Sequence, residues 1–332
     1  MKTLYLSLAA FLLAGGAVAQ TDLKCPDYAA GARSLKVIHM QPVRRGKRWL
    51  DGTPTDSLAV SCDERGMKTA EVQYDGKALT LRRAYVYSAT PEARKFCENL
   101  KSDEKRTTSF SEEGNSSLDD FCSRNRKKDF TMAAVYDAIP AAAKSGQAKP
   151  LHRVFTLFNK RGFPEKEYSF DSFNSMESVT VYDYDKNNNL TQITVTDPDG
   201  GQLRRETFSP GGPASPRVHS VYSETNQLKR KTADELRGDG TLRREVITDY
   251  DSDEQPIRRS EIYMDTTGVP QKKLIFDPDD QQPREEYDYT HELDKKGNWT
   301  EQRRTRLLFF NGSPVKDHDS PPEITKREFL YY

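Results

Sequence analysis

The sequence has few of the features on which most enzymes and membrane proteins depend. It contains only 5 His and 2 Trp among 332 residues, and apolar residues make up 35% of it. After the first 19 residues no stretch approaches the ~20 consecutive apolar residues of a membrane-spanning helix. Lys and Arg number 51, as do Asp and Glu, so there is no basic excess for binding nucleic acid. This composition excludes a thick α/β core and favours an ordered, very polar, β-rich chain.

Patterns for catalysis and metal binding are equally scarce. The histidines form no His-Glu-x-x-His motif, and no phosphate-binding loop, dinucleotide fingerprint or nucleophile elbow occurs. The best metal candidates are Asp249, Asp251 and Asp253, which alternate as in a calcium loop, but Glu254 stands where such a loop needs glycine. We expect these aspartates to form a turn instead. The sequence therefore predicts no enzymatic activity, no cofactor and no metal.

The N-terminus has the pattern of a secretory signal peptide. Lys2 precedes an apolar run over residues 4–13, and Ala17-Val18-Ala19 follows as a small-x-small cleavage site. Cleavage near Ala19 would leave a periplasmic or secreted protein without a transmembrane segment. We therefore expect a chain that folds in an oxidising compartment.

All four cysteines lie in the first 122 residues, at Cys25, Cys62, Cys97 and Cys122. An even number in an exported protein indicates disulfides, and three pairings are possible. We favour Cys25–Cys62 and Cys97–Cys122, because the second pair brackets what looks like one local insertion. The alternative, a metal site, lacks a Cys-x-x-Cys motif and a histidine at ligand spacing.

Beyond residue 150 short β-prone runs alternate with turn residues. The turns contain Gly, Asn and Asp and lie roughly 12 to 17 residues apart, which is typical of consecutive hairpins. The units resemble one another: Gly201-Gln202-Leu203-Arg204-Arg205-Glu206 is close to Gly240-Thr241-Leu242-Arg243-Arg244-Glu245. This self-similarity indicates a repeat architecture.

One repeat pattern points to a known family. In residues 182–191 a Tyr-Asp pair is followed by an Asn-rich turn and Asn-Leu-Thr, and residues 294–300 end in Asn-Trp-Thr. Over about residues 150–332 the chain resembles the RHS/YD repeats of bacterial envelope and toxin proteins. The resemblance implies a β-hairpin array that acts as a shell or scaffold, and it carries no catalytic residues. A MORN-like hairpin repeat is a near alternative.

The expected fold is mainly β, an antiparallel hairpin meander that forms a long twisted sheet or an open shell. Adjacent basic residues such as Arg258-Arg259 put one cation on each face, so we expect water on both faces over part of the sheet. Helix-like segments at 91–100 and 117–122 predict a small disulfide-bearing helical insertion near the N-terminus. The expected domains are a signal peptide at 1–19, an N-terminal β region with the insertion and two disulfides at 20–149, and the repeat region at 150–332.

The function that this sequence favours is that of a non-catalytic, exported scaffold. It would bind a protein partner or an envelope component through a broad sheet surface. A periplasmic immunity protein or toxin inhibitor is one specific version. A cell-wall glycan-binding module and an enzyme with a scattered site remain as alternatives, and nothing indicates a nucleic-acid partner.

Overall fold

The computed structural model describes residues 24–25, 32–46, 48–104, 117–137, 140–145, 148–211, 215–310 and 313–332. The expected signal peptide at 1–19 lies outside the described residues and stays a prediction. In the described part there are nineteen strands and three helices. The helices are α2 (Thr90–Glu104), α3 (Ser117–Arg124) and α4 (Pro140–Lys144).

The strands follow one another along the chain as hairpins. In the first half they are β1 (Ala32–Arg45), β2 (Arg48–Cys62), β3 (Lys68–Asp75), β4 (Ala78–Ser88), β5 (Phe130–Tyr136), β6 (Pro150–Phe158), β7 (Pro164–Phe170), β8 (Met176–Tyr184) and β9 (Leu190–Thr196). In the second half they are β10 (Gln202–Ser209), β11 (Arg217–Tyr222), β12 (Leu228–Leu236), β13 (Leu242–Tyr250), β14 (Pro256–Met264), β15 (Pro270–Phe276), β16 (Glu285–Leu293), β17 (Trp299–Phe310), β18 (Ser313–Lys316) and β19 (Glu323–Tyr331).

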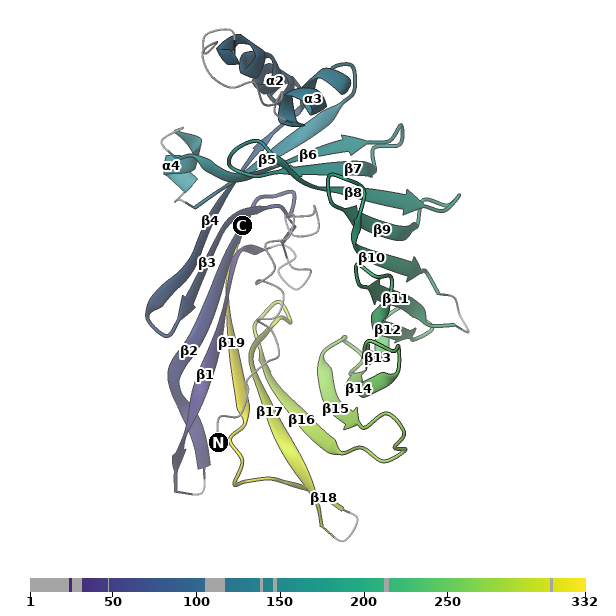
Figure 1. Ribbon diagram of the computed structural model, residues 1–332. Coiled ribbons are helices and arrows are strands. Elements are labelled where there is room, and N and C mark those ends of the chain that lie inside the picture. Colours follow the sequence, from purple (N-terminus) through teal and green to yellow (C-terminus); the bar gives the residue numbers. More distant parts are fainter. Residues whose placement is uncertain are drawn as a thin grey trace.

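These strands form a single antiparallel sheet that closes on itself (Figure 1). Each strand from β1 to β17 pairs with the next, and β19 then pairs with β17 on one side and with β1 on the other. The short β18 pairs with β17. The expected open sheet or shell is therefore wrong: 18 strands make a closed β-barrel.

The closure depends on pairings between the two ends of the chain. Leu35 of β1 lies opposite Phe329 of β19, and Glu301 of β17 lies opposite Lys326 of β19. Asp51 of β2 forms ion pairs with both Arg303 and Lys326, which ties β2 to β17 and β19 at the seam. An open meander would leave the backbone groups of two edge strands unpaired, whereas β19 satisfies both edges. Local sequence patterns carry no information on such distant partners.

Ten hairpin turns share one geometry. In each, the N–H of the first residue donates to the carbonyl of the fifth, and the fourth residue has a positive φ, as in the turn from Asp265 to Val269, where Gly268 has φ 84°. The first side chain often caps the turn: Asp265 Oδ1 accepts the N–H groups of Thr267 and Val269. Gly and Asn recur at the fourth position because they tolerate this conformation best.

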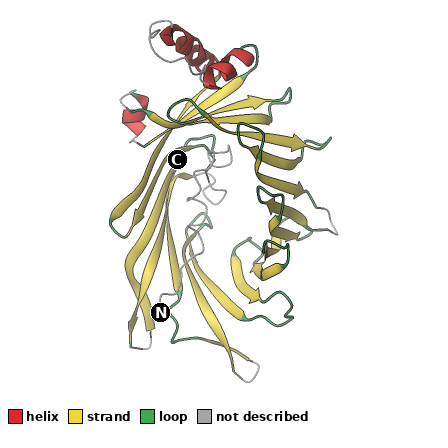
Figure 2. Cartoon of the chain, in the orientation of Figure 1, coloured by secondary structure: helices red, strands yellow, loops and turns green. Residues whose placement is uncertain are grey.

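The best-packed core lies under α2 and α3, on one face of β5–β8 (Figure 2). Phe121 of α3 contacts Phe130, Phe155 and Phe170 of the sheet, with ring centroids 4.8 to 5.8 Å apart. The predicted helical insertion is confirmed, with helices at Thr90–Glu104 and Ser117–Arg124. The structure has the Cys25–Cys62 and Cys97–Cys122 disulfides, which is the pairing that the sequence favoured. The second disulfide joins α2 to α3.

The rest of the barrel wall is one layer thick. The main contacts of β9–β17 are with their neighbours in the sheet, and no described helix covers them (Figure 2). In β12 and β13 most residues are half-buried, and the strands do not alternate between fully buried and exposed side chains. Side chains on both faces of the wall are therefore partly accessible to solvent.

Candidate functional site

The helices distinguish the two faces of the wall. Because α2 and α3 lie outside the barrel and pack on Phe155 and Phe170, the face that carries these residues is the outer one (Figure 1). Thr156 and Glu167, which lie opposite each other on the other face, therefore point inward. Following the pairing from strand to strand assigns every cross-strand row to one face. We call these faces the inner wall and the outer wall.

The inner wall holds buried carboxylates, each with hydrogen-bond donors. Glu167 is 2% exposed and accepts hydrogen bonds from the hydroxyls of Tyr182, at 2.8 Å, and Thr156, at 3.1 Å. Glu71 accepts one from the hydroxyl of Tyr85 at 2.6 Å. Burial and the charge of Glu71 raise the pKa of Tyr85, so this hydroxyl stays protonated and can donate. Donors of this kind offset the cost of burying a carboxylate.

A third inner carboxylate, Glu206 of β10, is held by two basic side chains. His219 Nε2 of β11 lies 2.6 Å from Glu206 Oε2, Arg204 forms an ion pair with the same carboxylate, and Phe208 stacks on the imidazole. Burial acts to raise the pKa of Glu206, but the hydrogen bond from His219 and the charge of Arg204 outweigh it, so the pKa lies below its usual value. The Glu206 carboxylate is therefore ionised at neutral pH.

Further along the inner wall, one row of residues crosses β12–β17. The pairing places Asp234, Glu245, Ile262, Lys273, Tyr287 and Arg306 side by side in that order. Asp234 pairs with Arg217, and a second inner pair joins Arg230 to Asp249 at 2.7 Å. The inner wall is thus a polar surface with charges of both signs and an apolar residue between them.

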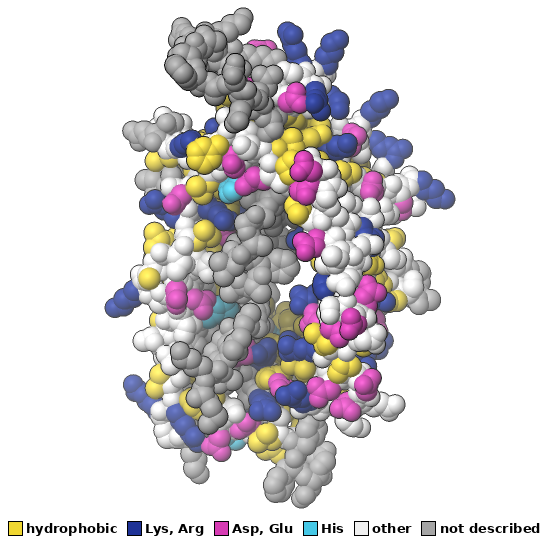
Figure 3. Space-filling view, viewed as in Figure 1, with side chains coloured by type: hydrophobic (Ala, Val, Ile, Leu, Met, Phe, Trp, Pro, Cys, Tyr) yellow, Lys and Arg dark blue, Asp and Glu magenta, His cyan; other side chains and the backbone are white. Residues whose placement is uncertain are grey.

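The outer wall of the same strands is charged as well. Glu261 of β14 pairs with Arg244 of β13 at 3.1 Å, and Glu286 of β16 pairs with Lys272 of β15. Both carboxylates are at most 9% exposed. In the view of Figure 3, basic and acidic side chains are interspersed over the surface of the molecule.

The structure brings no catalytic constellation together in the described residues. His39 contacts Thr325 and Asp56, His152 contacts Glu177, and His291 contacts Gln302, each at a different place on the wall. No group of three His, Cys, Asp or Glu side chains that could hold a metal ion occurs in the part of the chain that the structure describes.

Two of the three metal candidates of the sequence, Asp249 and Asp251, take structural roles. Asp251 Oδ1 accepts the N–H groups of Asp253 and Gln255, so it caps the β13–β14 turn. Asp249 lies within β13 and pairs with Arg230 on the inner wall. Asp253 lies in the turn itself, and the three carboxylates do not converge on a common point.

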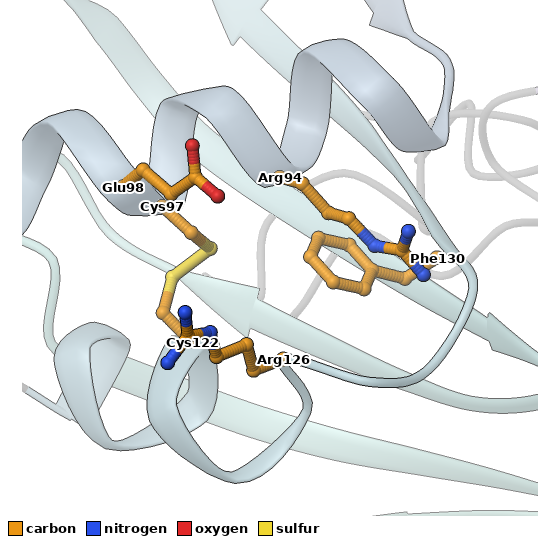
Figure 4. A pocket seen from close by; sticks show the side chains of 6 residues that line it. All are labelled: Arg94, Cys97, Glu98, Cys122, Arg126 and Phe130. Atoms are coloured by element: carbon orange, nitrogen blue, oxygen red, sulfur yellow. A yellow bond between two sulfur atoms is a disulfide. The ribbon is translucent and has the colours of Figure 1, made fainter.

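A small pocket opens beside the second disulfide, between the helices and the sheet (Figure 4). It measures about 190 Å³ and is lined by Arg94, Cys97, Glu98, Cys122, Arg126 and Phe130. The guanidinium of Arg94 already donates to the carbonyl of Lys128 and to Asp129, both at 2.9 Å. Binding pockets for drug-sized ligands usually measure about 300–1,000 Å³, so this pocket is too small for a ligand of that size.

The sequence did not single out the inner carboxylates Glu71 and Glu167, and it indicated Glu206 only as a charge beside the Arg204-Arg205 pair. A signal was present, because each of these carboxylates lies beside a paired strand whose inward positions hold Tyr, Thr or His. Recognising it requires the register of the strands, since each donor comes from another strand. The Arg-Arg pairs in the sequence predicted only that both faces of the sheet carry charge.

No described helix has the length and apolar character needed to span a bilayer. No family model matches the chain, and no curated protein matches it. The chain is similar to the crystal structure of a porin-like protein from Bacteroides uniformis, with 10% identity, a TM-score of 0.42, and coverage of 91% of this chain and 98% of that one.

Two toxin structures are more distant. The TcdB2-TccC3 complex without its hypervariable C-terminal region is 13% identical over 81% of this chain and 12% of that chain, with a TM-score of 0.13. The Photorhabdus luminescens Tc holotoxin pore is 9% identical over 87% of this chain and 20% of that chain, with a TM-score of 0.14. This chain thus spans a fifth or less of the toxin chains. These scores, and that of the porin-like protein, are too low to carry an argument, so the barrel rests on the strand pairing alone.

Proposed function

We propose that this chain is a non-catalytic binding protein of the bacterial envelope, which binds a protein partner or an envelope component on the walls of its barrel. The observation that carries the proposal is a single-layer wall with charged, half-buried side chains on both faces. Such a surface is broad, polar and exposed to water. Charged groups arranged in this way favour specific recognition of a complementary partner.

The use of the polar groups supports a binding role over catalysis. The best-placed acid–base pair, Glu206 with His219, is tied into an ion pair with Arg204 and a stacking contact with Phe208. Among the described residues the side-chain hydrogen bond of this histidine is with Glu206, and no hydroxyl or thiol group is hydrogen-bonded to it.

The location rests on chemistry that fits an oxidising compartment. Two disulfides join distant parts of the N-terminal half, and such bonds persist in the periplasm or outside the cell. The charges of the outer wall, such as Glu261 and Lys272, favour water on that side over lipid. The ten equal turns support the further proposal that the chain is an RHS/YD-like hairpin array.

An affinity experiment from the native envelope tests this function. The full chain, exported by its own leader and tagged, is cross-linked in cells, purified and analysed by mass spectrometry, with another exported protein of similar size and the same tag as control. A stoichiometric partner protein, or co-purified envelope glycan, that is absent from the control supports the proposal. Recovery of neither, together with turnover of a small substrate by the pure chain, would refute it.

A further inference from the structure

Adjacent basic residues occur on three neighbouring strands of the barrel. They are Arg243-Arg244 on β13, Arg258-Arg259 on β14 and Lys272-Lys273 on β15. Because successive side chains of a strand point to opposite faces, each pair puts one cation on each wall. The register places Arg244, Arg259 and Lys272 on the outer wall and their neighbours on the inner wall.

The outer members of these pairs are all neutralised. Arg244 pairs with Glu235 and Glu261, Arg259 pairs with Glu261 at 3.5 Å, and Lys272 pairs with Glu286. Arg259 also stacks over the ring of Phe276 at 4.2 Å. The outer wall therefore supplies one or more carboxylates for each cation.

The inner members have no such partner. No described carboxylate lies within ion-pairing distance of Arg243, Arg258 or Lys273, nor of Arg306 on β17. The nearby acids are engaged elsewhere: Asp249 with Arg230, Glu323 with Arg304, and Glu285 with the hydroxyl of Tyr287. Among the described residues the inner wall thus carries a cluster of cations without a direct ion pair, although Asp249 lies opposite Arg258 and the charges of Glu323 and Glu245 act on Lys273.

The electrostatics of this cluster agree with its geometry. Burial, and then the charges of Arg304 and Arg258, lower the pKa of Lys273. On the acidic side of the same row, burial and the charge of Asp234 raise the pKa of Glu245. Burial is the largest cause of both shifts, and a like charge adds to it in each case, while Glu323 and Glu245 act on the pKa of Lys273 in the opposite direction. An anion beside Lys273 would relieve this repulsion.

We propose that Arg243, Arg258, Lys273 and Arg306 dock an acidic, extended polypeptide segment of a protein partner. The inference rests on the proposed function and names the chemistry of the partner. Arginine binds carboxylates with two parallel hydrogen bonds, which suits Asp and Glu side chains. Ile262 and Tyr287, which lie in the same row, offer apolar contact between the charges.

The spacing of the cations suits an extended segment. Lys273 and Arg306 lie on the same row two strands apart, a separation of about 9.5 Å between their backbones. Acidic residues two positions apart on an extended chain are separated by about 7 Å, and their side chains cover the difference. Both Trp side chains already have partners, since Trp299 stacks with Arg327 and Trp49 donates to the carbonyl of His318, which argues against a sugar platform.

The test measures binding of fluorescent decaglutamate to the full chain by anisotropy, at low and at physiological ionic strength. We expect binding that weakens with salt, and about tenfold weaker binding by the double variant Lys273→Gln/Arg306→Gln. The matched control is Lys231→Gln, which removes an exposed, unpaired lysine from the outer wall and should change nothing. Circular dichroism checks the fold of each variant, which we expect to be intact because the inner substitutions remove repulsion.

Several results would overturn the inference. One is equal binding of decaglutamate to wild type and to the double variant, or an equal loss of affinity with Lys231→Gln. A second is equally tight binding of decalysine, which would show that the surface is not selective for acids. A third is binding of dextran sulfate without binding of decaglutamate, which would assign the cluster to a polysaccharide. Capture of a protein partner that survives the double variant would leave the proposed function standing while this docking site fails.

Discussion

The turn between β12 and β13 contains two glycines whose replacement by alanine should have opposite effects. Gly240 has φ +84°, and a Cβ added to it would meet nothing within 4 Å. Gly238, two residues earlier, also has open space around it, but its φ lies outside the left-handed region. The pair therefore isolates the effect of backbone conformation from that of packing.

The expected magnitudes follow from this difference. Holding an alanine in the left-handed conformation at position 240 costs the folded state about 1–2 kcal/mol. Alanine also reduces the conformational entropy of the unfolded chain, which favours folding by about 0.4–1 kcal/mol. Gly240→Ala should therefore lower the free energy of unfolding by about 1 kcal/mol. Gly238→Ala has only the second effect and should raise it by about 0.4–1 kcal/mol.

Urea unfolding followed by circular dichroism measures both variants against wild type. Because the two glycines share one exposed turn, effects on aggregation or export should be alike. If Gly240→Ala proved as stable as Gly238→Ala, the turn would not have the described left-handed residue. The account of the ten equal turns would then fail at this turn.

Two further predictions concern the inner wall and the helical insertion. Glu206→Gln should cost about 1–3 kcal/mol at neutral pH, whereas exposed Glu224→Gln should cost little. Because the folded pKa of Glu206 is lowered, its contribution is present above the unfolded value near 4.5 and lost as the pH falls through the folded pKa. The gap between wild type and Glu206→Gln should therefore shrink in acid, and a gap independent of pH would contradict this reasoning. Removing the second disulfide with Cys97→Ala/Cys122→Ala should cost about 3 kcal/mol and speed hydrogen exchange in α2 and α3, while unchanged exchange there would show that packing alone holds the helices.

Local features of the fold were open to prediction because they depend on a few neighbouring residues. The turn around Asp251 is an example: Asp251 caps it and Glu254 takes the left-handed position, as the turn interpretation of this acidic run requires. The helix that begins near Pro91 was predicted from its proline and its early glutamate. Each of these signals lies within about five residues of the feature it specifies.

The candidate site could be predicted only in outline. The Arg258-Arg259 and Lys272-Lys273 pairs indicated charge on both faces, and the structure has it. Glu261 shares β14 and its outer face with Arg259, but Glu286 lies on β16, so which member of Lys272-Lys273 is neutralised depends on a register that the whole sheet sets. The inner carboxylate Glu167 was missed for the same reason, and the contact of Glu206 with His219 of β11 was not foreseen.

The sequence by itself determined the strands, the turns and the polarity of both faces. These properties arise from alternation along a strand and from the few residues that accept a positive φ. The tertiary structure alone decided that the sheet closes, which wall is the inner one, and which cations lack a partner. Closure joins Leu35 to Phe329 and Asp51 to Arg303, residues that are far apart in the chain. Such contacts depend on the accumulated twist and register of 18 strands, which no local pattern encodes.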